Sequence, residues 1–489
     1  MASRLLSLFA LVSVASCHAV DVAPRADSTD SSGKYAKFPV IHSTNQDVFA
    51  DVWAKRDVWS SKRGIQTLPL ANRSDVAYYA RLDIGNPPQP NYVQLDTGSF
   101  ELWVNPDCST LEATSDIRFC QAVGSYNPSS SSSSVVSTST KTLRYGIGSA
   151  NIQYVTDDIT FAGSNSQLKS VQFGAATTTV DEFSGILGIG HGENVTIRYK
   201  NFVDELQDQG VTDTKAFSLA LGSKSEQEGV VIFGGIDTGK FAGTLQSQPI
   251  IPAAKSPDGV PRYWIAMDHM SLTPPSGNVK KYDNSTMAVF LDSGATLTLL
   301  PQALADAVAA DFGSDGTDSN GFYLVDCSLN NLPGTVDFAF PGITIQVPYN
   351  EMIRELRTSF GTQCYLGITP NSDFVLLGDT MLRSAYAVFD QTNDAIHLAQ
   401  YVNCGTNEVE ITTSMNMSQI TGQCDPPNFR NSASSTGSGT LPTGTATGTG
   451  AAAGSTGTGN AAPALYTAST VWIPVWVGAF FAIGLAGIL

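Results

Sequence analysis

Two short segments of the sequence each place an aspartate in a setting that favours acid–base chemistry. They read Val-Gln-Leu-Asp-Thr-Gly-Ser over residues 93–99 and Val-Phe-Leu-Asp-Ser-Gly-Ala over residues 289–295. Asp96 and Asp292 both end a mostly apolar run, which predicts a poorly solvated carboxyl at the end of a buried strand. If the two carboxyls lie close together, they cannot both be charged, so the pair keeps one proton over a wide acidic range.

Such a pair predicts hydrolysis by an activated water. The ionised carboxylate can accept a proton from the water, while the protonated carboxyl polarises the carbonyl of the bond to be cleaved. The pair can then protonate the leaving amine. Because this chemistry needs neither a metal nor a covalent intermediate, we expect no cofactor and no metal site.

The residues beside each aspartate are suited to supporting it. Gly98 and Gly294 allow the backbone to approach closely, and the hydroxyls of Thr97 and Ser293 can hold the loops in place. Ser99 completes the first segment. We therefore expect these five residues to surround the carboxyl pair.

The repeat of the two segments indicates how the chain positions them. Ile186-Leu187-Gly188 follows the first segment and Leu376-Leu377-Gly378 follows the second in the same order, which predicts two homologous lobes over residues 64–248 and 249–403. Throughout both predicted lobes the chain alternates short runs of β-branched and aromatic residues with Gly, Pro, Asn and Ser, so we expect an all-β fold. Apolar spacing predicts short helices at residues 201–209 and 301–312.

Composition excludes some functions. The 489 residues include 27 Lys and Arg against 44 Asp and Glu, for a net charge of −17. Residues 64–430 alone carry 19 basic and 38 acidic residues, a net charge of −19. No basic surface for nucleic acid is expected.

The N-terminus is typical of an exported precursor. Arg4, an apolar run and small residues up to Ala19 predict a signal peptide over residues 1–19. The following polar segment ends in two dibasic pairs at residues 55–56 and 62–63, which predicts a propeptide over residues 20–63. The mature chain then begins at Gly64, with Asp57 as the alternative.

The C-terminus is typical of a glycosylphosphatidylinositol (GPI) anchor. Residues 404–460 form a predicted Ser/Thr/Gly-rich stalk, and residues 461–489 end in an uncharged apolar tail with no basic residue after it. Small residues, a short spacer and this tail match a GPI signal that is removed on attachment, with Asn460 as the attachment residue. A terminal transmembrane helix is the alternative.

Cysteine usage agrees with export. Without Cys17 of the signal peptide six cysteines remain, which allow 15 pairings, and proximity favours Cys108 with Cys120. No pair has the Cys-x-x-Cys spacing of a metal site. Four sequons predict N-glycosylation, at Asn72, Asn194, Asn284 and Asn416.

Taken together, the motifs over roughly residues 77–400 resemble the pepsin-type aspartic proteases. The segments that carry the resemblance are 96–99 with 102–104, 143–149, 183–190, 231–237 and 374–390. The resemblance implies a bilobal fold with an active-site cleft between the lobes, Asp96 and Asp292 as the catalytic pair, and polypeptide substrates. Ala295 departs from the family pattern, which has Thr or Ser there.

The resemblance also assigns supporting roles. Segment 143–149 is similar to the flap that closes over substrate, with Tyr145 as its tyrosine, Gly146 beside it and Trp103 as the partner of Tyr145. By the same similarity, Cys327 pairs with Cys364, which leaves Cys404 for Cys424.

With the C-terminal signal, the chain resembles the fungal GPI-anchored yapsin-like group. This implies a monomeric protein-processing endopeptidase at the cell surface that is active at acidic pH and prefers Lys or Arg sites. An acidic body would attract cationic peptides.

Rival functions have weaker support. The body contains no Gly-x-Ser-x-Gly for a serine hydrolase, and none of its histidines begins a His-Glu-x-x-His zinc motif. A wall-displayed adhesion or structural protein that keeps a silent protease fold is the remaining alternative.

Overall fold

The computed structural model describes residues 34–42, 77–105, 108–110, 114–146, 148–161, 167–180, 184–226, 228–358 and 361–429. The predicted signal peptide, the two dibasic pairs, Asn72, Asn460 and the predicted GPI signal lie outside these residues. Strands dominate the described chain, so the expectation of a mostly β protein is confirmed. None of the described helices is both long and apolar enough to cross a bilayer.

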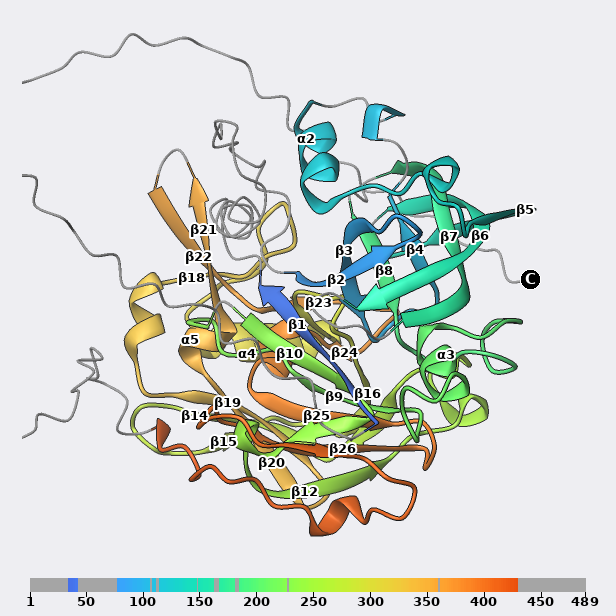
Figure 1. The fold of residues 1–489 in the computed structure, drawn as a ribbon. Helices are drawn as coiled ribbons and strands as arrows, with labels where there is room; N and C mark the ends of the chain where they lie inside the picture. Colours follow the sequence, from blue (N-terminus) through green and yellow to red (C-terminus); the bar gives the residue numbers. More distant parts are fainter. Residues whose placement is uncertain are drawn as a thin grey trace, which may run out of the picture. The chain divides into compact units, whose positions relative to one another are not determined.

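The largest sheet has 13 strands, in the order β12-β26-β25-β9-β10-β1-β2-β3-β8-β4-β7-β6-β5 (Figure 1). One end of this sheet consists of β2 (Tyr78–Ile84), β3 (Gln89–Asp96), β4 (Leu102–Val104), β5 (Val135–Arg144), β6 (Ser149–Phe161), β7 (Gln167–Val180) and β8 (Gly185–Gly188). The other end consists of β1 (Ala36–His42), β9 (Ala216–Ala220), β10 (Glu228–Phe233), β12 (Phe241–Pro249), β25 (Ala385–Asp390) and β26 (Ala395–Tyr401). Chain segments far apart in sequence thus share one sheet.

Smaller sheets complete the second half of the body. A five-stranded sheet contains β13 (Trp264–Met267), β16 (Met287–Leu291), β17 (Thr298–Leu300), β23 (Ile368–Pro370) and β24 (Leu376–Leu377). A four-stranded sheet contains β14 (His269–Thr273), β15 (Lys280–Lys281), β19 (Thr335–Phe340) and β20 (Ile343–Pro348). The remaining pairings join β18 (Leu324–Val325), β21 (Ile353–Thr358) and β22 (Gly361–Leu366), and join β11 (Gly235–Asp237) with β27 (Glu408–Glu410).

The sequence repeat corresponds to a repeat of strand pairing. In the first half β3 is parallel to β8, β4 is antiparallel to β8, and β4 is parallel to β7. In the second half β16 is parallel to β24, β17 is antiparallel to β24, and β17 is parallel to β23. Each half therefore buries the strand that leads to its aspartate between the same kinds of neighbours.

Both predicted helices are present. The helix expected at residues 201–209 is α3 (Phe202–Asp208), whose N-cap Asn201 accepts a side-chain hydrogen bond from Asp204 N–H, while Asn201 N–H donates to the Asp204 carboxylate. The helix expected at 301–312 is α4 (Gln302–Asp311), and its spaced apolar residues are buried. Sequence spacing did not reveal α2 (Thr114–Val123), α5 (Tyr349–Met352) or α6 (Asp379–Leu382). Single 3₁₀ turns lie at Cys108–Thr110, Pro128–Ser130, Thr238–Lys240, Ala253–Lys255, Cys327–Asn331 and Met417–Gln419.

Three of the predicted segment boundaries or segments coincide with strands of the structure: the lobe boundary at residue 248, the propeptide and the stalk. Residue 248 lies inside β12, which pairs with β26. The predicted propeptide contains β1, which pairs with both β10 and β2 and is drawn in blue near the middle of Figure 1. Residues 404–429 of the predicted stalk pack on the body, where β27 pairs with β11.

Candidate active site

The two aspartates lie at equivalent strand ends. Asp96 is the last residue of β3, and its register partner on β8 is Gly188. Asp292 directly follows β16, and its backbone N–H donates to the carbonyl of Leu377 on β24 at 3.0 Å. Leu95 and Leu291, the residues that precede the two aspartates, are fully buried in the core. Each aspartate therefore lies at the end of a strand that leads out of the core.

Four hydrogen bonds join the two loops across the pseudo-symmetric centre. The Thr97 hydroxyl donates to the carbonyl of Leu291 at 2.9 Å, and the Ser293 hydroxyl donates to the carbonyl of Leu95 at 2.9 Å. Each hydroxyl oxygen also accepts from the opposite backbone: Ser293 N–H donates to Thr97 Oγ1 at 2.9 Å and Thr97 N–H donates to Ser293 Oγ at 3.2 Å. These reciprocal bonds fix the spacing of the loops.

The glycines let the two carboxyls face each other. Gly98 N–H donates to Asp96 Oδ1 at 2.8 Å, and Gly294 N–H donates to Asp292 Oδ1 at 2.9 Å. A Cβ atom on Gly98 would lie 2.6 Å from Asp292 Oδ1, and one on Gly294 would lie 2.5 Å from Asp96 Oδ1. Each glycine therefore contacts the aspartate of the other loop, and no larger residue fits without displacing it.

The surroundings of Asp292 change the pKa of its carboxyl group. Burial, and then the charge of Asp96 together with the hydrogen bond that protonated Asp292 donates to it, raises the pKa of Asp292 well above the ordinary carboxyl value, although Gly294 N–H and Arg262 act in the opposite direction. A raised pKa next to a second carboxyl is what a proton-sharing acid–base pair requires.

Two residues assigned to the flap contact each other. Trp103 on β4 is fully buried, and its Nε1–H donates to the Tyr145 hydroxyl at 2.7 Å. Tyr145 and Gly146 follow β5 at the turn toward β6, and Tyr145 N–H donates to the carbonyl of Gly148 at 3.1 Å. This contact fixes the tyrosine against β4, the strand that follows the Asp96 loop.

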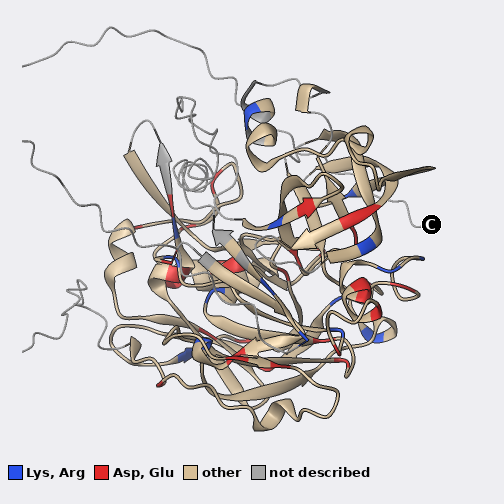
Figure 2. Cartoon of the chain, viewed as in Figure 1, with Lys and Arg blue, Asp and Glu red and all other residues tan. Residues whose placement is uncertain are grey.

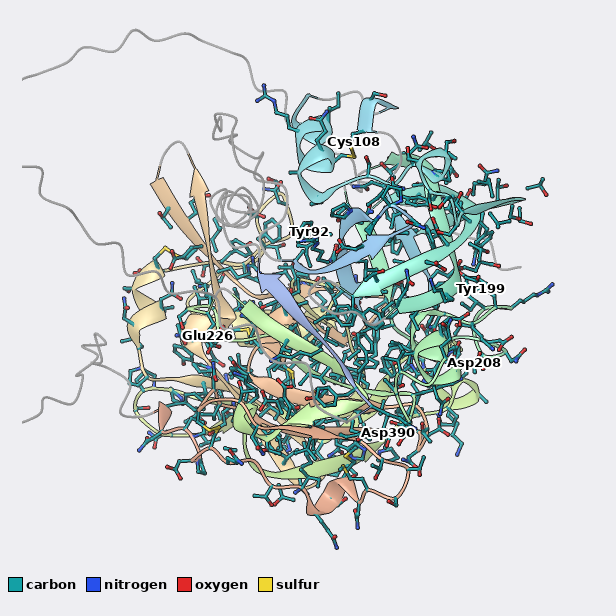
Figure 3. All side chains as sticks on the ribbon, viewed as in Figure 1. Tyr92, Cys108, Tyr199, Asp208, Glu226 and Asp390 are labelled. Atoms are coloured by element: carbon teal, nitrogen blue, oxygen red, sulfur yellow. A yellow bond between two sulfur atoms is a disulfide. The ribbon has the colours of Figure 1, made fainter. Side chains whose placement is uncertain are left out.

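Sequence reasoning missed a polar cluster beside the first loop. Glu101 is 5% exposed and pairs with Lys141 of β5. Its Oε2 also accepts from the hydroxyl of Tyr154 at 2.8 Å and from that of Tyr199 at 2.9 Å. Tyr199, labelled in Figure 3, comes from the segment before α3. The three partners are 40, 53 and 98 residues away in sequence, so no local motif could have indicated the cluster.

The six cysteines form three bonds in the structure: Cys108–Cys120, Cys327–Cys364 and Cys404–Cys424. The first bridge fastens α2, next to which Cys108 is labelled in Figure 3. The sequons at Asn194, Asn284 and Asn416 are all exposed.

The hydroxyl of Ser99, which completes the first aspartate segment, is buried and has no hydrogen-bond partner among the described residues. No group of three metal-ligating side chains occurs within the same ranges.

Comparisons with known proteins agree with this geometry. The family model for eukaryotic aspartyl proteases matches residues 77–401. "Secreted aspartic protease 3" of Candida albicans is 37% identical over 369 residues, which cover 73% of this chain and 85% of the relative. "Probable aspartic-type endopeptidase opsB" of Aspergillus oryzae is 35% identical over 379 residues, covering 73% and 76%.

A solved structure gives the same fold. The crystal structure of aspartic proteinase from Irpex lacteus matches with a TM-score of 0.56 at 20% identity, covering 76% of this chain and 98% of that one. Matched family segments, similar relatives and a shared fold lead to one conclusion: this chain belongs to the eukaryotic aspartyl protease family and is an aspartic endopeptidase.

Proposed function

We propose that Asp96 and Asp292 are the catalytic pair of this endopeptidase and that it hydrolyses peptide bonds at acidic pH. The observation that supports this most strongly is that each carboxyl faces the glycine of the opposite loop. Asp292, with its raised pKa, is the protonated partner that polarises the substrate carbonyl. Asp96 is the base that accepts a proton from the attacking water, and the pair later protonates the leaving amine.

Supporting roles follow from the same geometry. Thr97, Gly98, Ser293 and Gly294 hold the carboxyls in place. Tyr145 and Gly146 belong to the flap that closes over the peptide, and the hydrogen bond from Trp103 orients the tyrosine.

The test is peptide hydrolysis at about pH 4 by the processed protein. Asp96→Asn and Asp292→Asn should each lower kcat by roughly 10⁴-fold, because each removes one half of the acid–base pair. Asp373→Asn is the matched control, since Asp373 is an exposed carboxyl in the loop before β24. Wild-type activity in either of the first two variants would refute the assignment, and a wild type as inactive as its variants would favour the silent-fold alternative.

We also propose that the enzyme prefers Lys or Arg residues at the cleavage site and acts in protein processing. Its support is the net charge of −19 over residues 64–430, which attracts cationic peptides. The charged residues are sparse along the ribbon, and the acidic residues of α3 stand out in red (Figure 2). A mixed peptide library tests the preference: Lys or Arg should be enriched next to the cut, and enrichment of apolar residues instead would refute it.

Attachment to the cell surface is a further part of the proposal. The mature protein is a monomer held by a GPI lipid at Asn460, at the plasma membrane or in the cell wall, and is N-glycosylated. Its support is the small-residue site followed by an uncharged apolar tail. A phosphatidylinositol-specific phospholipase should release the protein from membranes, and Asn460→Gln should reduce the lipid-linked fraction. A protein that stays in the membrane after this treatment would refute the anchor.

Maturation by removal of residues 20–63 has a consequence for stability, because β1 lies in this segment. Phe38 of β1 is 3% exposed and packs edge-on against Phe161 and Phe233. Phe38→Ala should destabilise the precursor by about 3 kcal/mol and leave the processed protein unchanged. Phe217→Ala in β9 should destabilise both forms. An equal loss from Phe38→Ala in both forms would show that β1 stays with the mature enzyme.

A further inference from the structure

Arg262 lies between the two catalytic loops, in the connection that leads into β13. Its guanidinium carbon is 5.5 Å from the centre of the Phe100 ring and 5.4 Å from that of the Phe290 ring. Phe100 belongs to the first loop, and Phe290 lies on β16 two residues before Asp292. A guanidinium stacked on aromatic rings is held in a defined plane, which a lysine cannot reproduce.

The same side chain reaches the backbone of the first loop. Arg262 Nη1–H donates to the carbonyl of Gly98. Gly98 is the residue whose N–H binds Asp96 and whose Cα faces Asp292. A shift of this peptide would therefore move both carboxyls, so the arginine acts on the site through Gly98.

Asp258 keeps the arginine in place. Arg262 Nε–H donates to Asp258 Oδ2 at 2.8 Å, while Val260 N–H and Trp264 Nε1–H both donate to Asp258 Oδ1 at 3.0 Å. Burial acts to raise the pKa of Asp258, but these three donors and the arginine charge outweigh it and lower the pKa. Asp258 thus stays ionised into the acidic range in which the enzyme is expected to work.

We propose that Arg262 is a positioning residue for the reaction, a cation clamped between the two catalytic loops that fixes Gly98 and keeps a positive charge beside the carboxyl pair. The proposal rests on the assignment of Asp96 and Asp292 as that pair. No segment of the recognisable motifs contains Arg262.

The charge has a predictable effect on the pH profile. Among the described residues, the charged or titratable groups around the site are Asp258 on the same connection, the two aspartates of the pair, and Asp379 of α6, which interacts electrostatically with Asp292. Asp379 in turn faces Arg383 and Arg354. Phe100, Phe290 and Trp264 carry no charge. Because a cation stabilises the ionised pair, its removal should shift both limbs of the profile toward higher pH.

The experiment compares Arg262→Met and Arg262→Lys over the full pH profile of kcat and kcat/KM. The methionine variant should lose roughly 10-fold in kcat with little change in KM, and both limbs should move up by roughly half a pH unit. The lysine variant should keep the limbs of the wild type while its kcat falls, because the charge remains and the planar clamp is lost. Arg81→Met, which breaks the half-buried Arg81–Asp83 ion pair on β2, is the matched control and should leave the profile unchanged.

The outcomes separate this proposal from the function on which it rests. Superimposable profiles for Arg262→Met and wild type, or a change in KM alone, would overturn the positioning role. Retained activity in Asp292→Asn would instead overturn the catalytic pair. If Arg262→Met does not fold, Asp258→Asn provides the second test: it frees the arginine, so kcat should fall, and an unchanged kcat would contradict the clamp.

Discussion

The two loops that carry Asp96 and Asp292 have the same backbone frame but different surroundings. In both loops the glycine N–H donates to the aspartate of the same loop. The hydroxyl of the residue after each aspartate donates to a backbone carbonyl of the opposite strand. Beyond the glycine the loops diverge. The first continues toward Glu101, whose carboxylate is satisfied by one lysine and two tyrosines. The second continues to Ala295, whose carbonyl accepts from Asp379 N–H at 2.9 Å.

The surroundings of the second loop also contain a second buried carboxyl. The second loop has no hydroxyl at position 295, and behind it lies Asp379, a buried carboxyl with neither oxygen hydrogen-bonded among the described residues. Burial raises the pKa of Asp379 well above its ordinary value, against the charges of Arg383 and Arg354. Equivalent geometry with unequal electrostatics is how two carboxyls take separate acid and base roles.

The largest effect is expected from breaking the symmetric frame. Gly294→Ala places a methyl group 2.5 Å from Asp96 Oδ1, and Gly98→Ala places one 2.6 Å from Asp292 Oδ1. Each should lower kcat by on the order of 100-fold or more, because small displacements of reacting groups are costly. Gly243→Ala serves as the control: its φ of +74° is strained for alanine, but the site is open and far from the aspartates in the chain. Near-normal kcat in Gly294→Ala would contradict the close approach of the loops.

The next effect concerns the polar cluster found only beside the first loop. Glu101→Gln removes the ion pair with Lys141 and weakens both tyrosine hydrogen bonds, so it should cost about 2 kcal/mol in the free energy of unfolding. It should also lower kcat/KM, because Lys141 lies on the strand that leads to Tyr145.

A matched carboxylate exists elsewhere in the chain. Glu226, labelled in Figure 3, accepts from the Tyr401 hydroxyl at 2.7 Å and from Asn403 at 2.6 Å. Glu226→Gln should lose a similar amount of stability in urea titrations while kcat/KM of the folded enzyme stays the same. If both variants affect stability and catalysis equally, the Glu101 cluster has no special link to the flap.

Stability should depend on pH through the second loop. Because folding raises the pKa of Asp292, the folded protein binds this proton more tightly than the unfolded chain does. Its contribution to stability is complete below the ordinary carboxyl pKa of about 4 and is lost as the pH rises through the raised value. The free energy of unfolding should therefore fall from acidic toward neutral pH, and fall less steeply in Asp292→Asn. Identical slopes in the two proteins would argue against a raised pKa.

The smallest effect is expected from restoring symmetry at position 295. Ala295→Ser adds a hydroxyl near Asp292, and a donor to the carboxylate would lower its pKa. The limbs of the kcat/KM profile should then move to lower pH by less than about one unit. A shift in the opposite direction would mean that the new hydroxyl does not donate to the carboxylate.

The sequence was sufficient where the information is local. The spacing of Phe202 and Leu206, and of Leu304 and Val308, indicated α3 and α4, and the repeated Asp-Ser/Thr-Gly segments indicated the duplicated loops. Helix α2 was missed, although it contains Cys120 of the first bridge.

What the sequence could not provide depends on partners distant in the chain. The longest pairing of β1 in the sheet is with β10, almost 200 residues later. Arg262 reaches Gly98 across 164 residues, and an isolated arginine in a Pro-containing connection carries no signal of this contact.

The central claim, that the pair holds its proton on Asp292, can be tested by infrared difference spectroscopy of the resting enzyme at about pH 5. We predict a protonated-carboxyl band in the wild type that disappears in Asp292→Asn, while the separate band of buried Asp379 remains in both. A protonated-carboxyl spectrum that is unchanged by Asp292→Asn would contradict the claim.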